Sequence, residues 1–177
     1  MTPSRSTEPH PIRPRSLART AAVQALYQMD LAGTDLNRVI QEFQRDRFAP
    51  EIAAANMGES HREPDPDEKA EGADAQFFAD ILRGVVRRQR DLDPLIDQQL
   101  AEGWRLVRVD SILRAILRAG TYELMERTDV PARVVINEYI DVAHAFFDAD
   151  EPRVVNGVLD RLARKVRGAE LDNAKKG

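Results

Sequence analysis

The apolar residues of this chain follow the spacing of α-helices in almost every segment that contains them. The pattern is clearest where Leu36, Val39, Ile40 and Phe43 keep i, i+3, i+4, i+7 spacing, which places them on one face of a helix. Similar patterns recur up to residue 162. No alternation of apolar and polar residues bounded by turns, the pattern typical of a β-strand, occurs in the chain. The sequence therefore predicts an all-α fold with about seven helices.

Capping residues, glycines and prolines predict where these helices begin and end. The expected helix starts are Ser16, Asp35, Asp93-Pro94, Asp110 and Val130-Pro131, followed by a last helix after a turn at residues 148–152. Gly33 is expected to end the first helix, because glycine readily adopts the left-handed backbone at a helix terminus.

A length of 177 residues suits one domain with one core. We expect this domain to span residues 16–167. Residues 1–15, rich in arginine and proline, predict a flexible N-terminal arm, and residues 168–177 a flexible C-terminal tail. Residues 50–75 are acidic and nearly free of bulky apolar side chains, so a disordered loop is expected there.

Composition narrows the class of protein. No apolar run approaches the roughly 20 residues that cross a bilayer, and no secretory signal is visible, so a cytoplasmic protein without membrane contact is expected. The absence of cysteine excludes disulfides and thiolate metal sites.

Motifs for catalysis or metal binding are incomplete. Asp141 and His144 share a helical face, as in half of a di-iron site, but such a site needs a second pair of this kind. Phosphate-binding loops and hydrolase motifs are also absent. The sequence predicts no metal, no cofactor and no enzymatic activity.

Three arginines around the start of the first helix suggest nucleic-acid binding despite the net charge of −4. Arg13, Arg15 and Arg19 lie in a segment, residues 1–28, that has four arginines and one acidic residue. Guanidinium groups pair with phosphates and stack on unpaired bases, as binding of single-stranded RNA requires. A solvated basic tail is the alternative interpretation.

Two asparagines interrupt apolar helical stretches, Asn137 in VVINEYI and Asn156 in VVNGVL. A buried amide without a partner costs roughly 1–3 kcal/mol. We therefore expect both amides to have structural roles, bonded to each other, to a turn or to backbone groups. Gly157 is expected to permit close approach of two helix backbones.

Four segments in the same order resemble the NusB family of bacterial RNA-binding transcription antitermination factors. They are RSLARTAAVQALYQMDL, ILRAILRAGTYEL, VPARVVINEYIDVAHAFF and RVVNGVLD. The resemblance implies two perpendicular three-helix groupings. It also implies a function: together with ribosomal protein NusE, the chain would bind the boxA element of nascent ribosomal RNA transcripts. It would thereby help RNA polymerase to pass terminators.

The resemblance also implies sites. The arginine-rich start of the first helix and the turn at residues 150–156 would lie near the RNA, with Asp150 as a helix cap and Arg153 reaching a phosphate. Family members often have an aromatic residue where Val154 stands, so that stacking contact is missing here. The residues implied to face NusE are Tyr27, Trp104, Arg108 and Asp110. The acid that the family has near Leu113 has no clear counterpart, and Trp104 could instead cap the core.

Two alternatives remain open. NusB-like domains also precede rRNA cytosine methyltransferases, but the catalytic part of those enzymes needs cysteine nucleophiles, and this chain has no cysteine. The chain could also be a helical adaptor that binds RNA without catalysis, or one that contacts only protein. Both a monomer and a homodimer are compatible with its apolar helix surfaces.

Overall fold

The computed structural model describes residues 14–48 and 74–175, and this part of the chain contains α-helices and no strand. The helices are α1 (Pro14–Ala32), α2 (Leu36–Phe43), α4 (Ala75–Asp97), α5 (Ser111–Glu126), α6 (Ala132–Phe146), α7 (Glu151–Val166) and α8 (Gly168–Ala174). A π-helical turn, η1 (Gln44–Phe48), extends α2, and a 3₁₀ turn, η3 (Leu106–Arg108), precedes α5. The all-α prediction is confirmed.

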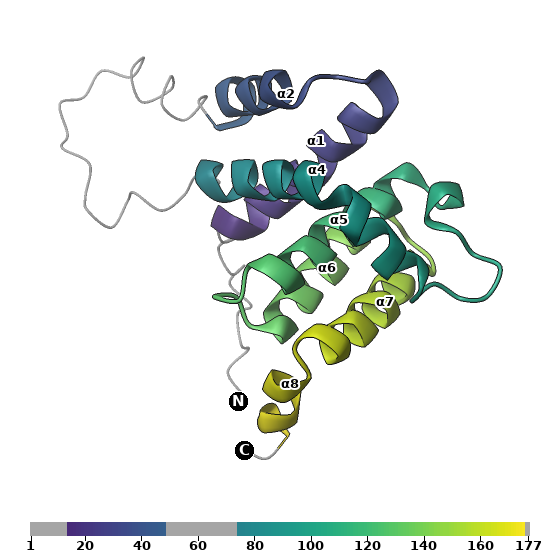
Figure 1. Ribbon diagram of the computed structural model, residues 1–177. Coiled ribbons are helices and arrows are strands. Elements are labelled where there is room, and N and C mark those ends of the chain that lie inside the picture. Colours follow the sequence, from purple (N-terminus) through teal and green to yellow (C-terminus); the bar gives the residue numbers. More distant parts are fainter. Residues whose placement is uncertain (1–13, 49–73, 176–177) are drawn as a thin grey trace, which may run out of the picture.

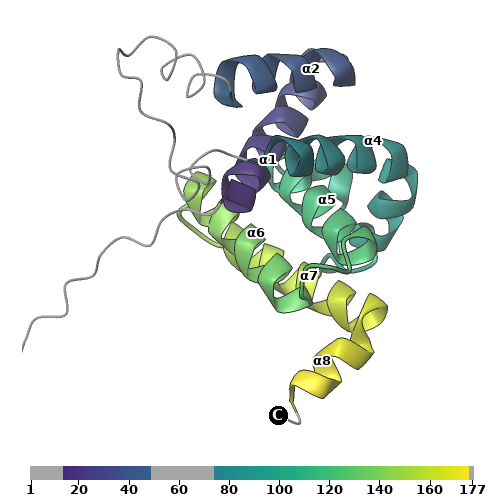
Figure 2. The ribbon, with the colours of Figure 1, turned by 90° about the vertical axis from the view of Figure 1, so that its left-hand side faces the viewer.

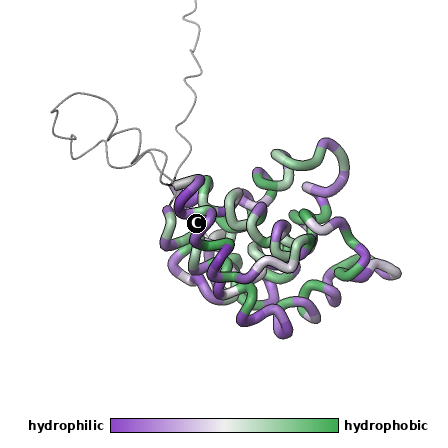
Figure 3. The backbone as a smooth tube through the Cα atoms, turned by 90° about the horizontal axis from the view of Figure 1, so that it is seen from above, coloured by the Kyte–Doolittle hydropathy of each residue, from purple (hydrophilic) through white to green (hydrophobic). Residues whose placement is uncertain are grey.

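The first six α-helices form two groups of three. Helices α1, α2 and α4 pack together, and α5, α6 and α7 form the second group beneath them (Figures 1 and 2). Helix α5 packs against both α1 and α4, so the two groups share one hydrophobic core. Hydrophilic and hydrophobic segments alternate along the helices, as expected when each helix buries one face (Figure 3). None of the described helices is both long and apolar enough to span a membrane.

Several predicted helix ends are confirmed. Gly33 has φ +62°, and its N–H donates to the carbonyl of Met29 at 2.9 Å, which closes α1. The Asp35 carboxylate accepts hydrogen bonds from the first turn of α2. Asp110 does the same for α5, where it accepts from the N–H groups of Ile112 and Leu113.

Two of the predicted helix starts are wrong. Helix α1 already begins at Pro14, so Ser16 lies inside it, and its hydroxyl donates to Glu138 at 3.0 Å. Helix α4 continues through Asp93-Pro94 to Asp97. The Asp93 carboxylate accepts two hydrogen bonds of 2.8 Å from Arg118 of α5 and caps nothing. Pro94 lies near the end of α4, where a missing N–H interrupts only one internal hydrogen bond.

The predicted C-terminal tail is also wrong over most of its length, because residues 168–174 form α8. Leu171 is buried against the core, and the Glu170 carboxylate accepts a hydrogen bond of 2.7 Å from the N–H of Ala132. This bond attaches α8 to the first residue of α6.

Residues 1–13 of the predicted arm and nearly all of the predicted acidic loop lie outside the described residues. At the end of that loop, Asp74 caps α4 through the N–H of Phe77.

Candidate nucleic-acid interface

Arg19, expected to contact RNA, is buried at the centre of the protein. Its guanidinium donates two hydrogen bonds of 2.8 Å to the carboxylate of Glu123, which is completely buried. The hydroxyl of Tyr139 also donates to this carboxylate. Glu138 lies 3.6 Å from the same guanidinium and is partly exposed. One buried network therefore joins α1, α5 and α6.

The buried network keeps Arg19 charged. Burial alone would lower the pKa of Arg19, but the hydrogen bonds and negative charge of Glu123 raise it above its ordinary value. The pKa of the Tyr139 hydroxyl is raised well above its usual value, first by burial and then by Glu123. Arg19 is only 2% exposed, so the prediction that it contacts RNA is wrong. Its charge instead neutralises a buried carboxylate.

Arg15, one turn earlier in α1, is exposed. Its guanidinium lies 3.7 Å from the Asp74 carboxylate and 3.5 Å from that of Asp129, and 4.6 Å from the centre of the Phe77 ring. Arg127 binds the same Asp129 and lowers the pKa of that carboxyl to about 2. Since the side chain of Arg15 is 44% exposed, a phosphate can approach it and compete with these weak surface pairs. Arg13 lies outside the described residues.

Arg153 and Asp150 lie at the start of α7. Both are exposed, and Arg153 has no ion-pair partner in the described part of the chain. Asp150 occupies the N-cap position, but its side chain accepts no hydrogen bond from the described residues, so the prediction that it caps the helix is wrong. Its backbone carbonyl does accept from the N–H groups of Arg153 and Val154.

The structure does not bring Arg15 and Arg153 into one compact cluster. Helix α7 runs antiparallel to α6, so Arg153 lies beside the C-terminal end of α6. Arg15, through Asp129, is held just before the N-terminal end of α6. The two guanidinium groups therefore lie toward opposite ends of α6, a helix of 15 residues that is about 22 Å long at 1.5 Å per residue.

Asn137 and Asn156 are exposed, so the prediction of two buried structural amides is wrong. Both line a groove between α6, α7 and α8. Neither amide forms a hydrogen bond with another described residue. The apolar neighbours in sequence turn inward while these two positions turn outward, which a count of apolar residues in a short segment does not resolve. A Cβ at Gly157 would meet only the guanidinium of Arg161, at 3.2 Å, and no atom of another helix, so this glycine does not mark a close helix contact.

Tyr27 lies in a second groove, of about 490 Å³, between the two helix groups. The apolar side chains in its lining are Val23, Leu31, Ala32, Phe43, Ile112 and Phe146. Leu31 is 63% exposed, so apolar surface is open to solvent there. Asp110 caps the helix that supplies Ile112 to this groove.

Arg108 and Trp104 belong to the connection between α4 and α5. Arg108 is exposed in η3, which Arg114 holds in place by donating to the carbonyls of Leu106 and Val107 at 3.2 Å. Arg114 also pairs with Asp30, at the C-terminal end of α1 near Tyr27, at 2.5 Å. Trp104 is 56% exposed, so it does not cap the core.

Sequence reasoning missed two buried charged residues. Glu123 lies four residues after Ala119 and seven after Ile116, on the buried stripe of α5. Arg167 continues the stripe of Leu159 and Ala163 at the end of α7. A charged residue that continues an apolar stripe was the available signal. Within residues 14–48 and 74–175 no group of three or more His, Asp or Glu side chains is arranged to hold a metal.

Comparison with known proteins agrees with this architecture. The model of the NusB family matches residues 16–164. A protein of Allorhizobium ampelinum named transcription antitermination protein NusB is 52% identical over 153 residues, which cover 86% of this chain and 88% of the relative.

Solved structures agree in fold. NusB of T. maritima is 28% identical, with a TM-score of 0.60 over 90% of this chain and 97% of its own. The antitermination factors NusB and NusE in complex with double-stranded RNA include a chain that is 22% identical. Its TM-score is 0.62 over 85% of this chain and 96% of its own, which shows likeness of fold. The family match covers most of the residues, and the relative is similar over nearly its whole length. The chain therefore belongs to the NusB family.

Proposed function

We propose that this chain is a transcription antitermination factor that binds the boxA element of nascent ribosomal RNA together with ribosomal protein NusE. The observation that carries the proposal is the family match over residues 16–164, with relatives about 50% identical that are named transcription antitermination protein NusB. Such a factor performs no covalent chemistry. Its function is a coupling of binding free energies among RNA, NusE and RNA polymerase in the bacterial cytoplasm.

The RNA surface that we propose runs along α6. Arg15 lies at one end and Arg153 at the other, with Asp150 beside Arg153. The exposed face of α6 lies between them, because α1 contacts one edge of that helix through Ser16 and Glu138 and α7 packs along the other. An extended single strand can span this separation, with a phosphate at each arginine. Arg13, which lies outside the described residues, stays a predicted RNA contact.

The groove around Tyr27 is the proposed docking site for NusE. Its apolar lining and exposed Leu31 provide the hydrophobic centre that protein interfaces require. Arg108 and Asp110 lie in or beside the segment that Arg114 attaches to α1, so they would contact the rim of the partner. Trp104 is exposed on the same connection and would extend this contact.

Retention of labelled boxA RNA on nitrocellulose, with and without NusE, tests this function. We expect salt-sensitive retention of boxA RNA by the chain alone. We also expect NusE to raise the affinity by roughly 5- to 150-fold, the usual range of coupling between two ligands. A scrambled RNA of equal length is the control and should gain little from NusE. If NusE binds but no RNA is retained under any condition, the chain is a protein-only adaptor and the proposal is wrong.

A further inference from the structure

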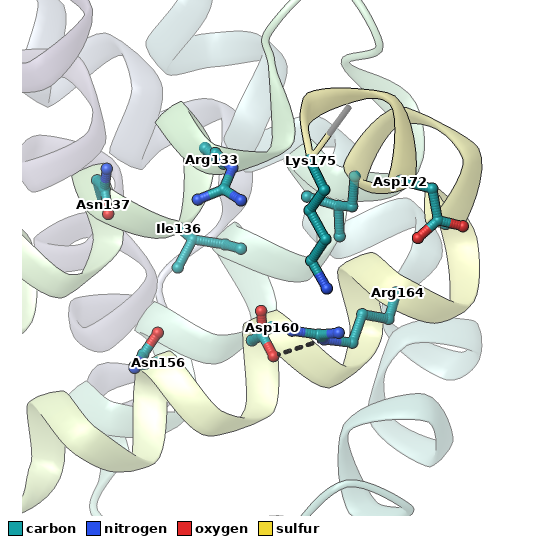
Figure 4. Close-up of a pocket in the computed structure, with 10 residues that line it drawn as sticks. Arg133, Ile136, Asn137, Asn156, Asp160, Arg164, Asp172 and Lys175 are labelled. Carbon is teal, nitrogen blue, oxygen red and sulfur yellow. Dashed lines mark hydrogen bonds and ion pairs between the residues drawn. The ribbon is translucent and has the colours of Figure 1, made fainter. Parts of the chain in front are cut away.

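The groove between α6, α7 and α8 is lined mainly by polar and charged side chains. It encloses about 350 Å³, near the lower end of the roughly 300–1,000 Å³ typical of small-ligand sites. Arg133, Ile136 and Asn137 line it from α6, Asn156, Asp160 and Arg164 from α7, and Asp172 and Lys175 from α8 and the residue after it (Figure 4). The groove thus depends on α8, which attaches to α6 through Glu170.

Four polar groups in this groove have no partner among the described residues. The amides of Asn137 and Asn156 form no hydrogen bond within that part of the chain, and Arg133 and Lys175 form no ion pair there. Arg164 differs from these four, because it pairs with Asp160 at 2.9 Å (Figure 4). Two carboxamides and two cations are therefore available to a ligand.

The apolar part of the groove is formed by Ile136 and Leu171, which are 7% and 9% exposed. The small exposed areas of these two side chains provide a limited apolar floor for the face of a planar ring. A carboxamide has both donor and acceptor atoms, which matches the mixed edge of a nucleobase. Guanidinium and ammonium groups bind phosphate. The face and the edge of a nucleobase and the phosphate of a nucleotide thus each have a counterpart in this groove.

The position of the groove fits the same chemistry. On α7, Arg153, Asn156, Asp160 and Arg164 follow helical spacing along one stripe, so Arg153 leads directly to Asn156. On α6, Arg133 lies one turn before Asn137. It is near the N-terminal end of this helix, the end beside which Asp129 and Arg15 pair. The groove therefore lies between Arg153 and Arg15.

We propose that this groove binds one nucleotide, with its base between Asn137 and Asn156 and its phosphate at Arg133 and Lys175. Asp160, which pairs with Arg164, disfavours a phosphate on the α7 side of the groove, so the phosphate is assigned to Arg133 on α6 and to Lys175 after α8. The nucleotide is either an unpaired residue of a bound RNA strand or a free ribonucleotide. Binding of an RNA residue rests on the proposed function, whereas binding of a free ribonucleotide does not.

Side-chain amide NMR signals of the full-length ¹⁵N-labelled protein test the proposal. Single-stranded boxA RNA and the four ribonucleoside 5′-monophosphates are titrated separately. We expect the Asn137 and Asn156 signals to shift with at least one of these ligands. The N137A/N156A double variant should weaken binding of that ligand about tenfold, the loss expected for two hydrogen bonds. The control N37A/Q41A removes two exposed carboxamides from α2 and should leave binding unchanged.

Each result decides a different point. Shifts with RNA alone identify an RNA nucleotide, whereas shifts with a monophosphate identify a free nucleotide. For RNA, R133A should reduce the logarithmic salt slope by roughly 0.7, while N137A/N156A should leave it unchanged because amides carry no charge. If RNA binds and neither amide signal moves with any ligand, the groove proposal is overturned and the RNA-binding function stands. If neither RNA nor monophosphates bind, the groove proposal is overturned, and RNA retention in the presence of NusE decides the proposed function.

Discussion

Replacing Glu123 by Gln is expected to lower the free energy of unfolding by about 3–5 kcal/mol, the usual cost of leaving a buried charge without its partner. The substitution preserves shape but removes the negative charge that neutralises Arg19. It also replaces one acceptor of the bidentate bond by an amide NH₂ group, which cannot accept from a guanidinium. Urea unfolding followed by circular dichroism at 222 nm measures the change.

Glu138→Gln is the matched control. Glu138 contacts the same guanidinium, but at 3.6 Å and with a side chain that is 22% exposed, so water compensates for its loss. A much smaller loss of stability is expected. If Glu123→Gln and Glu138→Gln unfold at the same urea concentration as the parent, Arg19 does not depend on the buried pair. It would then have to be considered again for RNA binding.

Replacing Arg167 by Met is expected to cost about 3 kcal/mol or more, because several buried carbonyl groups lose a charged donor. The guanidinium donates to the carbonyls of Glu123, Leu124, Arg127 and Val130 at distances between 2.5 and 2.9 Å. Glu123 and Leu124 lie in the last turn of α5, and Arg127 directly follows it. The carbonyls of Glu123 and Arg127 also accept backbone hydrogen bonds, so the carbonyls of Leu124 and Val130 are expected to lose most. Thermal and urea unfolding should both show the loss, and Arg167→Lys should recover part of it.

Arg164→Met is the control for this experiment. Arg164 lies on the same helix and pairs with Asp160, but its side chain is largely exposed. We expect no measurable change in the urea midpoint. Equal stability of the Arg167→Met and Arg164→Met proteins would contradict the role assigned to the Arg167 guanidinium.

The fold was largely predictable because its signals are local. Apolar spacing defined the helices, and Asp35 and Asp110 cap the helices that they were expected to cap. The errors arose where a distant partner decides the outcome. Asp93 binds Arg118 across the helix packing, so it does not begin a new helix. Leu171 and Glu170 attach α8 to the core, although the sequence there resembles a polar tail.

The site was less predictable, because the type of a residue does not reveal its surroundings. Arg15 and Arg19 are four residues apart on one helix, yet one is exposed and the other neutralises a buried carboxylate. The difference depends on Glu123, which is more than 100 positions away in the chain. The asparagines show the opposite error, since Asn137 and Asn156 are exposed although their segments are mostly apolar.

The proposed division of roles among the arginines is the central claim: Arg15 and Arg153 would contact RNA phosphates, whereas Arg19 is paired inside the core. The salt dependence of boxA RNA affinity in the R15A/R153A double variant tests it most directly. R38A/R45A is the control, since it removes the same charge from α2 and η1. We predict that the slope of log affinity against log salt shrinks by roughly 0.7 per lost contact in R15A/R153A and stays unchanged in the control. An R15A/R153A slope equal to that of the parent would contradict the account.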